Sequence, residues 1–198
     1  NYRNSVSVLA LSLSGNYINY NSDRLDANIS PGIAINFNPS PIFGLGKVFD
    51  IWGEYDYQLV ETSKNAANQN FSLEYKTDYF STGVNVNLPL SELMKIEQFY
   101  LGLKGGYGFF WGTTRLPNTN LASEKWQGQV IRFELCATNF SRFHFPMGVY
   151  IAYNFNNYSK DLKFPTAGAA INLGRPWTTS FQLGLRFALW QSASTSVF

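Results

Sequence analysis

Charged residues are scarce in this chain of 198 residues. Asp, Glu, Lys and Arg together supply only 14% of it, whereas about 25% is usual for soluble domains. A soluble monomer needs a charged surface to stay dispersed, so this composition disfavours one. The net charge is only +2, and the Lys and Arg residues are scattered along the chain. There is therefore no electrostatic case for a nucleic-acid partner.

Cysteine and histidine are each present once, as Cys136 and His144. One cysteine cannot form an internal disulfide, and one histidine with one cysteine cannot build a typical zinc site. We therefore expect no metal site and no cofactor. Cys136 is interpreted as a small buried filler, and His144 as a solvated residue of a short turn.

Long apolar runs are also missing. No stretch of about 18 apolar residues exists, which excludes a transmembrane helix. Nevertheless, 45% of the residues are hydrophobic and 17% are aromatic. Alternation disperses this apolar content, as a membrane protein built from β-strands requires. Eight segments alternate with a period of two residues: 6–20, 27–37, 49–59, 71–88, 99–111, 131–137, 145–155 and 178–190.

The last of these segments contains QLGLRFAL, residues 182–189. Leu183 and Leu185 share one face of this strand, and Gln182, Gly184 and Arg186 share the other. Across the eight segments the second face consists mainly of Gly, Ala, Ser and Asn with isolated charges. A soluble barrel or sandwich is the alternative, but this face suits the crowded lumen of a narrow barrel better than a solvated surface.

The sequence therefore predicts an all-β fold, a transmembrane antiparallel up-and-down β-barrel. The segments are long enough for a tilted membrane crossing, and closure leaves no unpaired edge in lipid. A ninth weak alternation covers residues 166–173. Because single-chain barrels normally have an even strand number, we assign it to a long loop and predict eight strands, with ten as the alternative.

Connectors 61–70, 112–125 and 158–177 fall on one side of this barrel and are assigned to the extracellular side. Residues 38–41 and 140–144 fall on the other side. Residues 1–190 form the predicted barrel, and residues 191–198 a short periplasmic tail. The apolar phase changes near Tyr79, which predicts a β-bulge there. Residues 90–98 have a helical pattern and are interpreted as a capped turn.

Seven charged residues point into the lumen by their phase. Unpaired charges there would cost several kcal/mol each, so we expect a network or a wet interior. The network either plugs the barrel or only fills it. The predicted lumen charge network consists of Asp50, Glu54, Asp56, Lys104, Arg132, Glu134 and Arg186. The glycines of residues 102–108 are interpreted as lumen spacers, because no helix follows them as a phosphate loop would require.

With these features the chain resembles the small outer-membrane β-barrels of Gram-negative-type bacteria, the class of the OmpA membrane domain, OmpX and OmpW. QLGLRFAL resembles the signal by which the barrel-assembly machinery recognises a final strand. Gln182, Gly184, Phe187 and Leu189 occupy its four defining positions. The chain departs from this signal because QSASTSVF follows Trp190, whereas the signal usually ends the chain at an aromatic residue.

The resemblance implies location in the bacterial outer membrane and a closed, charge-plugged barrel. Its function would be that of a structural or partner-binding envelope protein acting through its loops. A narrow channel for small or apolar solutes is the alternative, and a lipid A-modifying enzyme is less favoured because catalytic serines need a nearby base. The implied partners are outer-membrane lipid and lipopolysaccharide, the assembly machinery, and other envelope proteins in a complex. Four loop cations are compatible with lipopolysaccharide phosphates, with an ordinary solvated surface as the alternative interpretation: Arg115, Lys125, Lys160 and Lys163.

Overall fold

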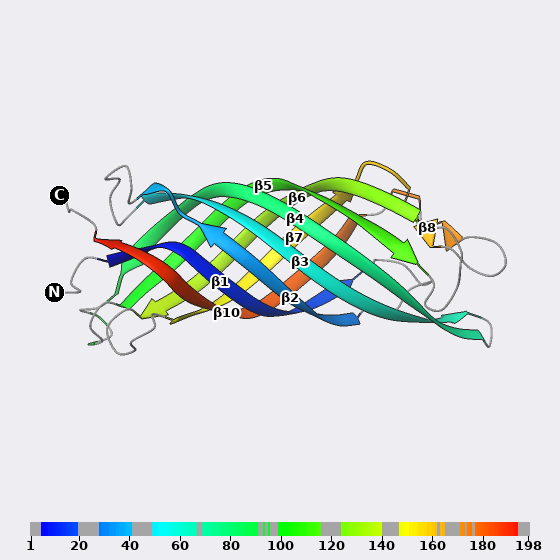
Figure 1. Cartoon of the computed structure of the whole chain (residues 1–198), viewed down its shortest axis with the longest axis horizontal. Coiled ribbons are helices and arrows are strands. Elements are labelled where there is room, and N and C mark those ends of the chain that lie inside the picture. Colours follow the sequence, from blue (N-terminus) through cyan, green and yellow to red (C-terminus); the bar gives the residue numbers. More distant parts are fainter. Residues whose placement is uncertain are drawn as a thin grey trace.

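A closed antiparallel β-barrel forms the protein in the computed structural model (Figure 1). The structure describes residues 5–19, 28–40, 49–66, 69–90, 93, 95, 99–115, 124–139, 147–161, 163–164, 171–172, 174–175 and 177–193. The barrel strands are β1 (Ser5–Asn19), β2 (Asn28–Phe37), β3 (Phe49–Ala66), β4 (Gln69–Pro89), β5 (Phe99–Arg115), β6 (Glu124–Asn139), β7 (Met147–Tyr158) and β10 (Trp177–Ala193). Each pairs with its neighbours along the chain, and β10 closes the barrel on β1. The predicted eight-stranded up-and-down barrel is confirmed.

The segment between β7 and β10 carries a small separate sheet. It pairs β8 (Lys163–Phe164) with β9 (Ile171–Asn172). This sheet lies outside the barrel wall, as the assignment of residues 166–173 to a loop predicted. In Figure 1 it lies at the end of the barrel opposite the two termini. We call the end of the barrel that carries this small sheet the hairpin end, and the opposite end the termini end.

The outer surface of the barrel is an apolar belt. Outward side chains alternate with inward ones along every strand, and the outward ones are large and exposed. Leu183 on β10 is 55% exposed and Phe133 on β6 is 53% exposed. No helix within the described residues is long and apolar enough to cross a membrane. Water would not tolerate so much contiguous apolar surface, whereas the hydrocarbon of a bilayer matches it.

The polarity of the inner and outer faces of the wall is reversed at the hairpin end. Along β6, Ile131 and Phe133 point outward, and Arg132 points into the lumen. Beyond Val130 the outward residues are polar, and the inward residue Trp126 is only 3% exposed. On strands β4 to β7 the wall therefore continues past the belt with polar groups outside and aromatic side chains inside.

The predicted β-bulge near Tyr79 is wrong, and this reversal of polarity explains the phase change instead. The register of β4 with both of its neighbours is unbroken around this residue, which pairs with Asp56 on one side and Phe110 on the other. Tyr79 points inward and is 6% exposed. The apolar phase changes because the surroundings of the wall change from lipid to water, not because a residue is inserted.

The irregularity of the barrel lies instead in the seam between β1 and β10. The register shifts on both sides of Leu9, so that Ser7 pairs with Gln191 and Leu9 with Trp190. In this shifted stretch Leu189 is 61% exposed and Trp190 is 53% exposed. Two consecutive apolar residues thus face outward at the termini end of β10.

Two predicted loops are shorter than expected. Most of residues 61–70 belongs to a hairpin in which Ala66 pairs with Gln69. Similarly, β5 extends to Arg115 and β6 begins at Glu124, inside the predicted connector 112–125. Backbone pairing satisfies N–H and C=O groups in water as well as in lipid, so the strands continue after the belt ends. Figure 1 shows the β3–β4 hairpin projecting beyond the rest of the wall.

Several other predictions concern the termini end. His144 and its turn lie outside the described residues. In the predicted capped turn 90–98, Leu93 is helical and Lys95 has a positive φ of 53°, and most of the remainder lies outside the described residues. β10 continues to Ala193, three residues into the predicted tail, and residues 194–198 are not described.

Candidate functional site

Arg132 lies at the centre of the lumen. Its Nη2 is 3.0 Å from Glu54 Oε1 and 3.0 Å from Glu134 Oε2. Its Nη1 donates hydrogen bonds to Gln182 Oε1 at 2.7 Å and to Asn154 Oδ1 at 3.2 Å. The side chain is only 3% exposed. A buried guanidinium needs this coverage, because an unpaired charge in the lumen would be strongly destabilising.

A second arginine from β10 meets the same two carboxylates. Arg186 binds Glu134 through both terminal nitrogens, in the bidentate arrangement that favours Arg over Lys. Its Nη2 is also 3.1 Å from Glu54 Oε2. Its guanidinium lies over the ring of Tyr150, 4.5 Å from the centroid. We call Glu54, Lys104, Arg132, Glu134 and Arg186 the charged cluster.

Lys104 joins the cluster from β5. Its Nζ is 3.3 Å from Glu134 Oε1 and 5.3 Å from the centre of the Trp52 ring. Trp52 packs in this position because the nearby wall residue on β5 is glycine: a Cβ added to Gly106 would lie 2.5 Å from the indole. A glycine in the wall thus makes room for a large lumen side chain.

The charged cluster crosses the lumen. Glu54 is on β3, Arg132 on β6 and Arg186 on β10. In the closed order of the eight strands, β3 lies three strands from β6 and three from β10. Ion pairs between strands so far apart run across the interior rather than along the wall. The cluster therefore spans the lumen.

A layer of amides lies beside the cluster. Gln182 receives the hydrogen bond from Arg132 and donates one to Asp56 Oδ2 at 2.8 Å. Gln58 also donates to Asp56 Oδ2, at 2.8 Å. Asp56, Gln58 and Gln182 are each at most 3% exposed. This layer again links β3 to β10 across the lumen, and the carboxylate of Asp56 balances the third cation of the cluster.

Asp50 lies apart from the other six predicted charges. Its Oδ2 accepts hydrogen bonds from Asn87 Nδ2 at 2.5 Å and from Asn85 Nδ2 at 3.4 Å. No ion pair joins it to another residue whose side chain the structure describes. The structure thus places three cations with three carboxylates in one connected group, and holds the fourth carboxylate with amides.

An aromatic layer fills the hairpin end of the lumen. Phe110 is 1% exposed and contacts three rings, with centroids 5.5 Å away for Tyr79, 5.8 Å for Trp126 and 4.8 Å for Tyr158. These residues come from four consecutive strands, β4 to β7. The tight fit requires small neighbours, since a Cβ on Gly128 would lie 2.4 Å from the Phe110 ring. The sequence analysis missed this layer, although the phase change near Tyr79 marks it.

The predicted assembly signal is divided between the two faces of β10. Gln182 and Gly184 point inward, and a Cβ at Gly184 would lie 2.6 Å from the Tyr150 ring. Phe187 is half-buried, and Leu189 is exposed in the irregular seam. Gln182 thus also has a place in the amide layer that the signal pattern alone did not reveal.

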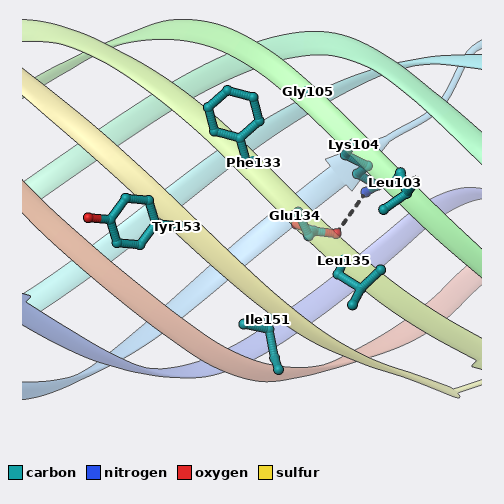
Figure 2. Close-up of a pocket in the computed structure, with 8 residues that line it drawn as sticks. All are labelled: Leu103, Lys104, Gly105, Phe133, Glu134, Leu135, Ile151 and Tyr153. Atoms are coloured by element: carbon teal, nitrogen blue, oxygen red, sulfur yellow. Dashed lines mark ion pairs between the residues drawn. The ribbon is translucent and has the colours of Figure 1, made fainter.

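A shallow groove of about 440 Å³ lies on the outer wall across β5, β6 and β7. Figure 2 shows the lining residues, with the ion pair between Lys104 and Glu134 drawn as a dashed line. The groove walls are the outward residues Leu103, Phe133, Leu135, Ile151 and Tyr153. The floor contains Gly105, where a Cβ would meet nothing within 4 Å. The groove is a dent in the apolar belt.

No group of three or more His, Cys, Asp or Glu residues suited to hold a metal ion occurs in the described part of the chain. The cationic nitrogens of the lumen already contact carboxylates and amides. The polar and charged side chains of the lumen link distant strands and lie in the interior of the barrel.

The fold of this chain is similar to that of known proteins. No protein-family model matches the chain, and no curated protein sequence matches it. The chain resembles the crystal structure of Ail, the attachment invasion locus protein of Yersinia pestis, solved with the heparin analogue sucrose octasulfate. The TM-score is 0.54 with 9% identity, over 93% of this chain and 98% of Ail. It also resembles Neisserial surface protein A, with a TM-score of 0.51 and 7% identity, over 92% of this chain and 98% of that one.

This is the fold of a small outer-membrane β-barrel. The likeness spans nearly the whole of each chain, and the apolar belt agrees with it independently. At identities this low the similarity concerns the fold alone. The role of this barrel therefore depends on its own residues.

Proposed function

We propose that this protein is an integral outer-membrane barrel with a closed lumen. It serves as a structural or partner-binding envelope protein through its hairpin end, rather than as a pore or an enzyme. The observation that carries the proposal is the pair of contacts from Glu54 to Arg132 and Arg186 across the lumen. These contacts place charged side chains where a solute would have to pass.

A narrow channel is the alternative function. It would need a continuous path of water or of apolar surface through the barrel. Three successive layers oppose such a path: the charged cluster, the amide layer and the aromatic layer. The groove of Figure 2 offers none, because it lies on the outer wall.

Single-channel recording tests the proposal. The refolded protein, inserted in a planar bilayer and verified by its resistance to protease, is expected to show no discrete openings at either polarity. Openings of reproducible conductance in the wild-type protein would instead establish a channel, with the charged cluster as its selectivity element. A refolded porin inserted in the same way serves as the positive control.

A further inference from the structure

Asp50 lies at the termini end of the lumen and is only 2% exposed. The other lumen charges balance without it, because three carboxylates already lie with three cations in the charged cluster and the amide layer. Lys104 acts on Asp50 only through its electric field, since its Nζ pairs with Glu134 Oε1 at 3.3 Å. Asp50 therefore carries a buried negative charge that no ion pair among the described side chains neutralises. Such a charge is strongly destabilising unless a cation compensates it.

Neutral amides hold the Asp50 carboxylate in place. Its Oδ2 accepts hydrogen bonds from the side-chain nitrogens of Asn87 and Asn85. The side chain of Asn38, in the turn after β2, also forms a hydrogen bond with Asp50. Amide N–H donors match an ionised carboxylate, which can only accept hydrogen bonds. These contacts orient the carboxylate, but they leave its charge uncompensated because asparagine is neutral.

Two buried oxygens at this place have no hydrogen-bond partner within the described part of the chain. They are Asp50 Oδ1 and Asn85 Oδ1, and Asn85 is 7% exposed. Asp50 on β3 is directly paired with Asn85 on β4, so the two side chains are neighbours inside the lumen. Buried acceptors are normally partnered. Both oxygens therefore point to a bound group that is not part of the protein chain.

Glycine on the adjacent strand leaves the wall bare beside the amide oxygens. A Cβ added to Gly102 on β5 would lie 3.1 Å from Asn85 Oδ1 and 3.1 Å from Asn87 Oδ1. The two amide oxygens thus converge on the same stretch of wall, next to the buried carboxylate. We call Asp50, Asn85 and Asn87 the Asp50 site.

The chemistry of the Asp50 site is that of hard oxygen ligands. A water molecule could donate hydrogen bonds to these oxygens, but it would not neutralise the carboxylate. Transition metals prefer imidazole and thiolate ligands, and calcium affinity depends on the number of charged ligands. The site offers one carboxylate with neutral amide oxygens, which matches the charge of a monovalent ion. Carbonyl oxygens replace the hydration shell of such an ion in potassium channels.

We propose that the Asp50 site binds a monovalent metal cation inside the termini end of the barrel. The ion contacts Asp50 Oδ1 and the amide oxygens, neutralises the buried charge and links β3 to β4. Asparagine suits this role because its amide has donors for the carboxylate and an acceptor oxygen for the cation. The proposal goes beyond the envelope role and holds whether or not the lumen conducts.

Urea unfolding in phosphatidylcholine vesicles tests the site. The protein is unfolded in sodium, potassium, calcium or N-methylglucamine chloride at one ionic strength, with the salt on both sides of the bilayer. N-methylglucamine is too large to enter the site. Asp50→Asn removes the charge at nearly constant volume. Asp161→Asn is the matched control, because Asp161 is 42% exposed and lies between β7 and β8. Heat-modifiable migration on gels verifies that each variant is folded.

We expect sodium or potassium to raise the urea midpoint of the wild-type protein relative to N-methylglucamine. Above the dissociation constant, each tenfold increase in ion concentration should favour the folded state by about tenfold. D50N should lose this dependence, and without the ion it should be at least as stable as wild type because it buries no charge. D161N should respond as wild type does.

Equal wild-type midpoints in sodium, potassium and N-methylglucamine chloride would overturn the proposal and indicate that a proton neutralises Asp50. A response to calcium alone would overturn it too, as would a D50N response equal to that of wild type. Asn85→Ala provides a second test that keeps the carboxylate. This variant should need a higher ion concentration for half of the stabilisation, and an unchanged concentration would contradict the site as proposed.

Discussion

Arg132 is the residue whose removal should damage the protein most. Its guanidinium neutralises both Glu54 and Glu134, which are 3% and 4% exposed. Arg132→Ala leaves these carboxylates with fewer partners, and breaking a buried ion pair costs about 3–5 kcal/mol. We expect a decrease of that size in the free energy of unfolding, measured by urea titration of the protein in lipid vesicles.

Arg175→Ala is the control for this prediction. Arg175 Nε lies 3.8 Å from Asp161 Oδ1, and the two side chains are 69% and 42% exposed. Exposed pairs contribute at most about 1 kcal/mol. If the two substitutions lower stability equally, the charged cluster is not a buried network.

Two adjacent glycines provide a second test at this scale. A Cβ at Gly106 would lie 2.5 Å from the Trp52 ring and 2.8 Å from Thr82 O, whereas at Gly105 it would meet nothing within 4 Å. Gly106→Ala should therefore destabilise the barrel by about 1–3 kcal/mol through overpacking. Gly105→Ala should be neutral or slightly stabilising, because alanine narrows the unfolded ensemble. Equal effects in urea unfolding would show that Trp52 does not pack against Gly106.

The interaction partners of individual residues were harder to predict than whether a side chain points into the lumen or outward. Alternation alone indicates that Asp50 and Asp56 point inward, but not at which height each meets the opposite strands. That height depends on strand tilt and stagger, which are properties of the closed barrel. Asp56 therefore joins Gln182 on β10, whereas Asp50 meets Asn85 and Asn87 on β4.

At the scale of the strand, the residues of β6 show where the apolar belt ends. Its outward residues change from Phe133 and Ile131 to Gln129 and Gln127, while its inward residues change from Arg132 to Val130 and Trp126. A period of two located residues 131–137 of β6 and their faces, but not the part of the strand from Glu124 to Val130. The predicted bulge at Tyr79 was wrong because the alternation was assumed to have one outer solvent throughout.

Lysine substitutions along β6 test this boundary. Phe133→Lys puts a charge within the belt and should cost about 2–4 kcal/mol if that position is near the bilayer midplane. Gln127→Lys lies beyond the belt on the same face and should change stability by less than about 0.5 kcal/mol. Unfolding in vesicles measures both. A comparable loss at Gln127 would mean that hydrocarbon extends to that level.

At the scale of the whole molecule, the proposed closed lumen would have two barriers. The charged cluster and amide layer fill its middle, and the aromatic layer around Phe110 fills its hairpin end. Opening one barrier should leave the other in place. We therefore expect Arg132→Ala and Phe110→Ala each to stay electrically silent in planar bilayers, and the double variant to show openings.

This expectation separates two interpretations of a silent wild-type protein. If Arg132→Ala alone conducts, the charged cluster is the only effective barrier and the aromatic layer is permeable to ions. If the double variant is folded, inserted and still silent, the amide layer is sufficient to block the lumen. The number of layers was not predictable from the sequence, because it depends on which inward residues lie at the same level along the barrel axis.

The seam between β1 and β10 has a consequence for the linear order of the chain. Ser5 and Ala193 are paired neighbours at one end of the barrel, so a short linker could join them and the chain could be opened at any other connector. Such circular permutation is tolerated where chain ends lie close together at the surface. The permuted protein would keep every strand pair, yet QLGLRFAL would no longer stand in its last strand. We expect the permuted protein to refold in vitro but not to assemble in cells, and assembly in cells would show that QLGLRFAL does not act as an assembly signal.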